Sequence, residues 1–153
     1  MKAIVTGGAG FIGSNLVDQL IKDGNEVIVI DNLSSGKKEN INSKANFVLV
    51  DIRNLDEIKP HFEGVDYVFH TAALARVQPS IVDPKTYNDV NVGGTLNVLI
   101  ASKDAGVKRV VYSASSSAYG NQETMPVRED MLASPMSPYG LQKYIGELYC
   151  RLF

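Results

Sequence analysis

Residues 7–13 read Gly7-Gly8-Ala9-Gly10-Phe11-Ile12-Gly13 and follow directly on the apolar run Ala3–Thr6. Glycines at this spacing, after a strand and before a helix, are typical of a phosphate-binding turn. One glycine allows the tight turn, one lets a pyrophosphate approach the backbone, and one lets helix and strand pack closely. The phosphates would bind at the free N–H groups and the positive end of the following helix. The alternative is a glycine-rich turn that binds no ligand. The surrounding sequence is needed to distinguish the two interpretations.

Outward from this turn, short apolar runs alternate with longer helix-like segments. The predicted strands are Ala3–Thr6, Val27–Ile30, Phe47–Val50, Tyr67–His70 and Arg109–Ser113. The predicted helices are Phe11–Asp23, Leu55–Phe62, Lys85–Ala105 and a last one that begins near Pro138. Nearly continuous apolar strands indicate a parallel sheet covered on both faces, and the alternation implies right-handed crossovers. The sequence therefore predicts an α/β fold, a doubly wound parallel sheet of the Rossmann type, in one domain over residues 1–153.

Acidic residues after the second and third strands point to a dinucleotide. Asp31 lies about 18 residues beyond Gly13, where this fold places the acid that accepts hydrogen bonds from ribose hydroxyls. A carboxylate there repels a 2′-phosphate, so Asp31 predicts NAD rather than NADP; the alternative is that it caps a turn before Asn32. Asp51 would accept from the adenine amino group or, alternatively, cap the helix after Asn54.

Small residues follow the fourth predicted strand. Thr71, Ala72 and Ala73 would allow a cofactor to approach the backbone closely. They also suit ordinary packing, so they support the cofactor site without deciding it.

Two further motifs indicate proton transfer. Tyr139 and Lys143 lie four residues apart on the last predicted helix, so both can reach one site. A phenol with its ordinary pKa of about 10 is a poor base, but a nearby cation and a positive nicotinamide ring favour its phenolate form. The serine-rich stretch Ser113–Ser117 ends the fifth strand, at the edge where open α/β sheets bind ligands. Its hydroxyls would relay a substrate proton to Tyr139; the alternatives are a serine-rich turn and a surface pair.

Composition limits the partners and the location that we expect. The 153 residues are 44% hydrophobic and 21% charged, with a formal net charge of −2, which is ordinary for a globular domain and gives no electrostatic case for nucleic acid or an anionic membrane. Cys150 is the only cysteine, so no disulfide forms within the chain. No apolar run nears the roughly 20 residues of a membrane span, and no leader pattern precedes the first strand. We expect a cytoplasmic protein with no metal site and no nucleic-acid or membrane partner.

The whole chain resembles the extended short-chain dehydrogenase/reductase family, and most of all its UDP-glucose and UDP-N-acetylglucosamine 4-epimerases. Besides the glycine turn and the serines, the matching motifs are Asp31-Asn32-Leu33-Ser34-Ser35-Gly36, Asp51-Ile52-Arg53, His70-Thr71-Ala72-Ala73, Asn91-Val92-Gly93-Gly94-Thr95 and Tyr139–Lys143. The resemblance implies NAD as cofactor, a UDP-sugar as substrate and a homodimer.

The resemblance also assigns roles to single residues. It implies that Ser115 and Tyr139 lie at the sugar 4-hydroxyl, and that Lys143 binds the nicotinamide ribose and favours the phenolate. Asn91 and Ser113 would lie near the nicotinamide end of the cofactor, and Asn32, Ser35 and Gly36 near the adenosine end. With the residues above, the predicted cofactor-binding set is Gly7, Gly10, Phe11, Ile12, Gly13, Asp31, Asn32, Ser35, Gly36, Asp51, Ile52, Thr71, Ala72, Ala73, Asn91, Ser113, Tyr139 and Lys143.

The serine segment distinguishes chemistries within this family. The 4,6-dehydratases carry Thr-Asp-Glu where this chain has Ser115, Ser116 and Ser117, and the decarboxylases usually keep a glutamate at the position of Ser117. The missing carboxylates disfavour both of these chemistries, and the triple serine looks most like the epimerases that accept N-acetylated sugars. A non-catalytic NAD-binding module and another reductase or dehydratase of the family stay open as alternatives, and net formation of NADH would mark a dehydrogenase.

The resemblance carries two further expectations. Members of the family run to about twice this length, so we expect the C-terminal substrate domain to be absent and the chain alone to lack efficient activity. The family commonly pairs the helices that correspond to Lys85–Ala105 and Pro138–Phe153 with their mates in a dimer. Apolar residues outside one sheet-facing stripe fit that contact, unless all of them belong to the core: Val90, Leu96, Ile145 and Leu148.

Overall fold

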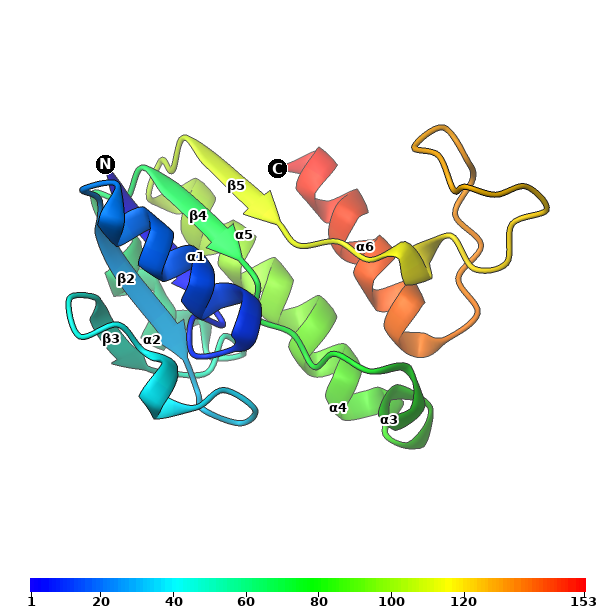
Figure 1. The fold of residues 1–153 in the computed structure, drawn as a ribbon, viewed down its shortest axis with the longest axis horizontal. Helices are drawn as coiled ribbons and strands as arrows, with labels where there is room; N and C mark the ends of the chain where they lie inside the picture. Colours follow the sequence, from blue (N-terminus) through cyan, green and yellow to red (C-terminus); the bar gives the residue numbers. More distant parts are fainter.

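A five-stranded, fully parallel sheet lies at the centre of the computed structural model, which describes residues 1–153 (Figure 1). Its strands are β1 Lys2–Thr6, β2 Glu26–Asp31, β3 Asn46–Leu49, β4 Tyr67–His70 and β5 Arg109–Tyr112. They lie in the order β3-β2-β1-β4-β5. The chain first adds β2 and β3 on one side of β1, and then crosses over to add β4 and β5 on the other side. The predicted doubly wound Rossmann arrangement is confirmed.

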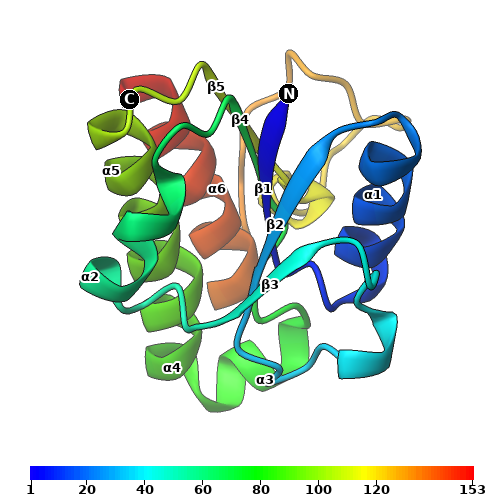
Figure 2. The same cartoon turned by 90° about the vertical axis from the view of Figure 1, so that its left-hand side faces the viewer.

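Helices cover both faces of this sheet. They are α1 Phe11–Lys22, α2 Leu55–Ile58, α3 Val77–Val82, α4 Pro84–Asn88, α5 Thr95–Asp104 and α6 Pro138–Leu152. Figure 2 shows α1 on one face, with α2, α5 and α6 on the other. Because successive strand residues point to opposite faces, Val5 packs in a cluster with Val17 of α1, whereas Ile4 packs in a cluster with Val98 of α5. Burial on both faces explains why β1 and β2 are apolar at almost every position.

The predicted helix Leu55–Phe62 is divided in the structure. The α-helix α2 ends at Ile58, and the 3₁₀ helix Lys59–Phe62 continues it. Pro60 has no N–H group and therefore cannot donate the bond to residue 56 that a continuous α-helix needs.

The predicted helix Lys85–Ala105 consists of three elements. A π-helix over Asp89–Gly94 separates α4 from α5. At this wide turn Asn91 bonds the backbone of Leu74, and the backbone of Gly94 lies so close to Ile52 that a β-carbon would be 2.6 Å from Ile52 Cδ1. These two contacts give a physical reason for the wide turn, and such turns are frequent at functional sites.

Helix α3 was not predicted from the sequence. It is only six residues long, and Pro79 lies inside it. Proline is tolerated there because the N–H groups of a first helical turn have no partner within the helix. Two predicted strand ends, Val50 and Ser113, lie one residue beyond β3 and β5.

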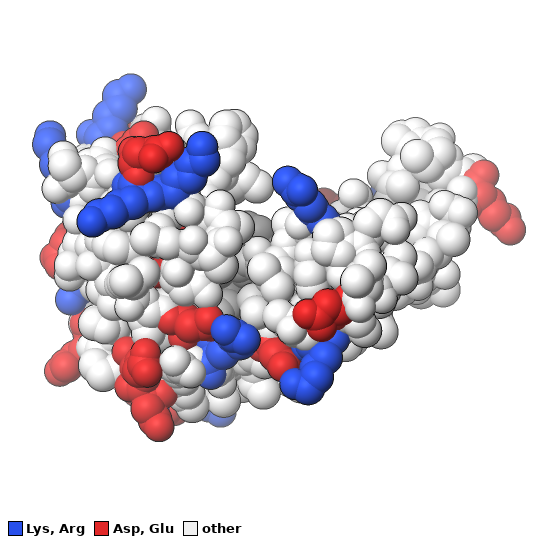
Figure 3. All heavy atoms as spheres, turned by 90° about the horizontal axis from the view of Figure 1, so that it is seen from below, with Lys and Arg blue, Asp and Glu red and all other residues white.

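The outer surface is mixed in charge. On the face drawn in Figure 3, acidic and basic side chains are interspersed among uncharged atoms. None of the helices combines the length and the apolar character needed to cross a bilayer. A long loop between Tyr119 and Ser137 extends away from the sheet, at the right of Figure 1.

Candidate functional site

A cleft of about 320 Å³ lies beyond the carboxyl ends of the first four strands. This is the edge where the strand order reverses, and open α/β sheets bind ligands there. Most of the predicted cofactor-binding residues line it: Gly7, Gly10, Phe11, Ile12, Gly13, Asp31, Asn32, Ser35, Asp51, Ile52, Thr71, Ala72 and Ala73. Four lining residues were not predicted: Ser34, Val50, Leu74 and Val90. Each of the four is next to a predicted residue in the sequence, which is the signal that could have identified them.

The glycine turn brings the start of α1 against the end of β1. The Gly10 N–H donates to the Gly7 carbonyl at 3.1 Å, and the Ser14 N–H donates to the Gly10 carbonyl at 3.0 Å. A β-carbon at Gly13 would collide with the Gly7 carbonyl oxygen, so only glycine fits. No side chain caps α1, and its first-turn N–H groups are left for another acceptor at the cleft. This end of the helix suits a pyrophosphate.

Asp31 forms part of the cleft wall and also fixes the turns beside it. Its Oδ2 accepts from the Ala9 N–H at 3.0 Å, and its Oδ1 accepts from the Leu33 N–H at 2.7 Å. Asp31 therefore caps a local turn, which was the alternative interpretation, and its role toward the ribose stays a prediction. Each carboxylate oxygen retains one acceptor site, which leaves capacity for the ribose hydroxyls expected from the sequence.

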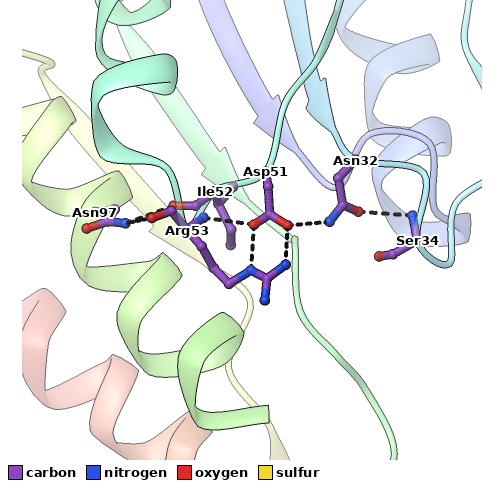
Figure 4. A network of polar contacts seen from close by, with 6 residues as sticks. All are labelled: Asn32, Ser34, Asp51, Ile52, Arg53 and Asn97. Carbon is purple, nitrogen blue, oxygen red and sulfur yellow. Dashed lines mark hydrogen bonds and ion pairs between the residues drawn. The ribbon is translucent and has the colours of Figure 1, made fainter. Parts of the chain in front are cut away.

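Asp51 is the centre of the polar network in Figure 4. Its Oδ1 accepts from Arg53 N at 2.9 Å and Arg53 Nε at 3.0 Å, and its Oδ2 accepts from Arg53 Nη2 and Asn32 Nδ2, both at 2.8 Å. Hydrogen bonding from the Arg53 side chain lowers the pKa of Asp51 to about 2. Four donors fill the acceptor capacity of a carboxylate. A bond from an adenine amino group would therefore have to replace one of them.

The alternative role for Asp51, capping the helix after Asn54, is wrong for its side chain. The Asn54 N–H bonds the Asp51 backbone carbonyl, and no side chain caps α2. The network instead reaches α5, because Asn97 Nδ2 donates to the carbonyls of Ile52 at 3.0 Å and Arg53 at 2.8 Å. These hydrogen bonds connect the segments after β2 and β3 to α5, in the helix layer on one face of the sheet. Asn97 was not predicted, because a polar residue on a helix gives no sequence signal for such a contact.

Asn91 and Gly36 lie behind the cleft rather than in its lining. Asn91 is 1% exposed; its Oδ1 accepts from the Leu74 N–H at 2.9 Å, and its Nδ2 donates to the Leu74 carbonyl and to Gln142 Oε1, both at 3.1 Å. Gly36 packs against Ala9, since a β-carbon would be 2.7 Å from Ala9 Cβ. Both residues therefore support the backbone of the cleft.

The predicted serine segment lies beside the start of α6. Ser115 Oγ accepts from the Ser117 N–H at 3.2 Å and caps the 3₁₀ helix Ser116–Ala118. Ser137 Oγ caps α6 by accepting from the Gly140 N–H at 3.1 Å. Ser113 continues from β5, and its N–H bonds the His70 carbonyl at 3.1 Å. The serine segment and the first turn of α6 lie side by side, since a β-carbon at Gly140 would be 2.5 Å from the Ser117 carbonyl oxygen.

Tyr139 and Lys143 differ in their exposure. Tyr139 is partly exposed, and its backbone N–H is held by Ser80 Oγ at 3.1 Å. Lys143 is 3% exposed, and its Nζ lies 4.2 Å from the centre of the Tyr112 ring. Burial lowers the pKa of Lys143 to about 8. No carboxylate forms an ion pair with it. Cys150 and Glu147, further along α6, are near enough to act on the Lys143 ammonium group and partly offset this lowering of its pKa.

The residues fit NAD by their chemistry. Unused helix N–H groups suit a pyrophosphate, and the Asp31 carboxylate suits a diol. The Thr71–Leu74 backbone lines the cleft opposite the glycine turn, and a β-carbon at Gly7 would be 2.7 Å from Ala72 N. No group of three or more His, Cys, Asp or Glu side chains is arranged to hold a metal ion.

Known proteins match this chain along its length. Residues 3–153 match the sequence profile of the NAD dependent epimerase/dehydratase family. The chain is 45% identical over 152 residues to a putative UDP-glucose 4-epimerase of Methanocaldococcus jannaschii, covering 98% of this chain and 50% of that protein. The chain thus spans about half the length of the curated relatives it matches.

Solved structures share this fold closely. A UDP-glucose 4-epimerase from Thermotoga maritima with UDP-glucose superposes with a TM-score of 0.97 at 43% identity. A UDP-N-acetylglucosamine 4-epimerase from Methanobrevibacter ruminantium M1, in complex with UDP-N-acetylmuramic acid, gives 0.94 at 44% identity. A UDP-glucose 4-epimerase from Thermus thermophilus, in complex with NAD, gives 0.93 at 39% identity. Each match covers 99% of this chain and 50% of the other.

NAD is the cofactor of the matching family, in agreement with the sequence prediction. The match runs through the glycine turn, Asp31, the serine segment and α6, so it includes every element of the site described above. With this coverage and with relatives above 40% identity, the chain belongs to the NAD dependent epimerase/dehydratase family.

Proposed function

We propose that this chain is the NAD-binding part of a nucleotide-sugar 4-epimerase that acts on UDP-glucose and UDP-galactose or on their N-acetylated counterparts. The observation that carries the proposal is the juxtaposition of two sites at one sheet edge. The cleft with the glycine turn and Asp31 follows β1–β4, and the serine segment with the Tyr139 helix follows β5. Relatives that match along almost the whole of this chain, and so across both sites, are named as 4-epimerases of UDP-sugars.

The NAD contacts are assigned as follows. The pyrophosphate binds at the first turn of α1, between Gly10 and Gly13, and the adenosine ribose hydroxyls donate to Asp31. The adenine lies against Ile52, beside the Asp51 network. The nicotinamide ribose would reach the ammonium group of Lys143, which forms no close ion pair with a carboxylate. When bound, NAD would supply a reversible hydride acceptor for C4 of the sugar.

The chain's own residues move the proton. Tyr139 takes the proton of the sugar 4-hydroxyl, directly or through the Ser115 hydroxyl, while C4 is oxidised to the ketone. Lys143 lies four residues further along α6 and is assigned to the nicotinamide ribose. After the 4-keto sugar has turned over, Tyr139 returns the proton as the ketone is reduced. The net redox change is zero, so the reaction consumes no external oxidant.

Three other functions make different predictions. A dehydratase of this family is disfavoured because Ser116 and Ser117 offer no carboxylate for elimination of water. The cleft alone would also serve a non-catalytic NAD-binding module, in which Lys143 would still bind the nicotinamide ribose but the hydroxyls of Tyr139 and Ser115 would have no proton to transfer. A dehydrogenase would accumulate NADH with a hydroxylated substrate, whereas an epimerase would not.

The test starts with the chain as given. Calorimetry should show NAD binding, and a coupled assay with UDP-galactose should show no efficient turnover, because orienting the sugar is worth several kcal/mol of barrier. Ordinary turnover by the chain alone, about 1–1,000 per second, would contradict the expected need for a substrate domain. Absence of NAD binding would contradict the proposed function itself.

We also infer that copies of the chain associate through α6. Leu148 is 39% and Leu141 48% exposed on this helix. One residue of the predicted contact is excluded, because Val90 packs against the core under α5 and lines the cleft. Leu96 and Ile145 are partly buried and stay candidates.

A further inference from the structure

A buried histidine joins the cleft to the helix layer. His70, the last residue of β4, is 1% exposed. Its Nδ1 lies 2.6 Å from Thr6 Oγ1, and its Nε2 lies 2.9 Å from Thr95 Oγ1. The ring does not line the cleft, and the proposed reaction gives it no role. Both ring nitrogens are nevertheless bonded, so the arrangement fixes which of them carries the proton.

The bond beyond Thr95 decides the direction on the Nε2 side. Thr95 Oγ1 lies 2.6 Å from the backbone carbonyl oxygen of Asn91 and donates to it. A carbonyl can only accept, and a hydroxyl has a single proton. Thr95 has therefore used its proton on Asn91, and His70 Nε2 must be the donor toward Thr95.

The charge state of the ring decides the direction on the Nδ1 side. Burial, aided by the nearby Lys143 charge, lowers the pKa of His70 to about 3. A neutral imidazole has one N–H, which lies on Nε2, so Nδ1 accepts from the Thr6 hydroxyl. Thr6 Oγ1 in turn accepts from the Ala72 N–H at 3.3 Å. A one-way hydrogen-bond chain thus runs from Ala72 through Thr6, His70 and Thr95 to the Asn91 carbonyl.

This hydrogen-bond chain begins and ends at elements of the site. Ala72 belongs to the Thr71–Leu74 wall of the cleft. At the far end, the Asn91 side chain bonds both the N–H and the carbonyl of Leu74, and also Gln142 Oε1 of α6. Gln142 directly precedes Lys143 in the sequence. Hydrogen bonds therefore hold the Thr71–Leu74 wall at Ala72 and at Leu74. Through Asn91 and Gln142 the wall is also connected to α6, the helix of Tyr139 and Lys143.

We propose that His70 is a positioning residue whose neutral Nε2–H tautomer fixes the Thr71–Leu74 wall of the cleft relative to α6. The inference rests on the proposed function for the identity of the ligand, NAD. It does not depend on that function for the hydrogen-bond chain itself. The other neutral tautomer would leave the Nε2–Thr95 contact without a proton, because Thr95 already donates its own to Asn91. A charged ring would donate to Thr6 Oγ1, which also accepts from the Ala72 N–H, and the Thr6 hydroxyl would lose the acceptor for its own proton.

The first experiment reads the tautomer in the unmutated chain without NAD. Nitrogen-15 NMR of the imidazole should show a bare Nδ1 and a protonated Nε2, and this pattern should persist from about pH 5 to pH 8, where an ordinary histidine titrates. The titratable groups that face the ring are Lys143 and Tyr112, whose ring centre lies 5.6 Å away. A protonated Nδ1, or titration within this range, would overturn the proposal.

The second experiment asks whether the hydrogen-bond chain matters for the cleft. Thr6→Val keeps the side-chain shape but leaves the Ala72 N–H without its acceptor. We expect faster hydrogen exchange at the Ala72 amide and about tenfold weaker NAD binding. Ser102→Ala is the matched control, because Ser102 is also buried and its hydroxyl donates only to Val98 within α5. It should leave NAD affinity unchanged even if it lowers stability.

The outcomes separate this inference from the proposed function. If the unmutated chain binds NAD and Thr6→Val binds it equally well, the positioning role is wrong. If the unmutated chain binds no NAD, the proposed function fails, and the tautomer and the Ala72 exchange rate still decide whether the hydrogen-bond chain exists. Equal losses of NAD affinity in Thr6→Val and Ser102→Ala would show a general effect of stability and would also overturn the positioning role.

Discussion

Gly140 in the first turn of α6 lies directly against Ser117: a β-carbon at position 140 would be 2.5 Å from the Ser117 carbonyl oxygen. This contact sets how closely α6 approaches the serine segment. Gly140 follows Tyr139 in the sequence, so the missing side chain permits the approach beside the residue that we propose as the proton acceptor.

The Gly140→Ala variant should separate these two elements. The added methyl group must displace either the helix or the serine turn, and overpacking of this kind costs about 1–3 kcal/mol of stability. Denaturant unfolding would measure the loss. Gly93→Ala is the matched control, because nothing lies within 4 Å of a β-carbon at Gly93. If Gly140→Ala were as stable as Gly93→Ala, the contact would not be as tight as described.

The choice between NAD and NADP should depend on Asp31. Asp31→Ala removes the carboxylate that opposes a 2′-phosphate, so the preference for NAD over NADP should narrow. It should also weaken NAD binding in absolute terms, because the Ala9 and Leu33 N–H groups lose their acceptor. Calorimetry with both nucleotides would measure the two effects, with Asp23→Ala at the far end of α1 as control. Binding of NADP as tight as NAD by the unmutated chain would contradict the assignment.

His70 should make the fold sensitive to acid. Its pKa is lowered from 6.5 to about 3 in the folded chain, so the unfolded chain binds one more proton between these values. The contribution of His70 to the free energy of unfolding therefore has its full value above about pH 6.5. It decreases as the pH falls, by at most about 1.4 kcal/mol per pH unit. The lowered pKa of Asp51 adds a similar loss only below about pH 4, its ordinary range.

Urea unfolding between about pH 7 and pH 4.5 isolates the histidine contribution. The midpoint of the unmutated chain should fall across this range. His70→Gln should be less stable at neutral pH, but its midpoint should depend much less on pH. Parallel pH profiles for the two proteins would show that another group causes the loss.

Self-association should depend on the exposed side of α6. Light scattering at tens of micromolar should give a mass near twice the 16.6 kDa of one chain, because a dimer would cover Leu141 and Leu148. Leu148→Glu should shift the chain toward the monomer, whereas Val77→Glu on α3 serves as the control at another exposed apolar position. A strictly monomeric unmutated chain would contradict the dimer.

Much of the fold follows from local sequence signals. The strands were predicted to within one residue at each end. For β1 and β2 the signal is clearest, because both faces of these strands are buried and they are apolar at almost every position. The glycine turn and Asp31 were predicted because their chemistry requires fixed residue types at fixed spacing. Helix ends followed where a cap or a proline marks them, as Ser137 and Pro138 do for α6.

Features that depend on tertiary contacts could not be predicted in the same way. The π-helix before α5 arises where Asn91 meets Leu74 and Gly94 meets Ile52, and both partners are distant in sequence. The bidentate contact of Arg53 with Asp51 is local, but its consequence, a carboxylate with no acceptor site to spare, appears only when Asn32 is placed beside it. Which side chains of α6 are exposed likewise depends on the other elements that pack against this helix.

The proton-transfer residues should rank in a definite order. Activity can be measured in a chimaera that joins this chain to the C-terminal half of the Thermotoga maritima enzyme, with which it shares 43% identity. Tyr139→Phe should lose most activity, Lys143→Ala nearly as much together with NAD affinity, and Ser115→Ala less, because a relay hydroxyl can be bypassed. A reversed order would contradict the assigned roles.

The most direct measurement is the turnover of UDP-galactose by the chimaera with and without Tyr139→Phe, with bound NAD measured in both. The substitution removes one hydroxyl group, so folding and NAD binding should persist while turnover falls about 100- to 10,000-fold, the contribution of a general base. Near-normal turnover by Tyr139→Phe would contradict the proposed proton transfer and leave Tyr139 as a structural residue of α6.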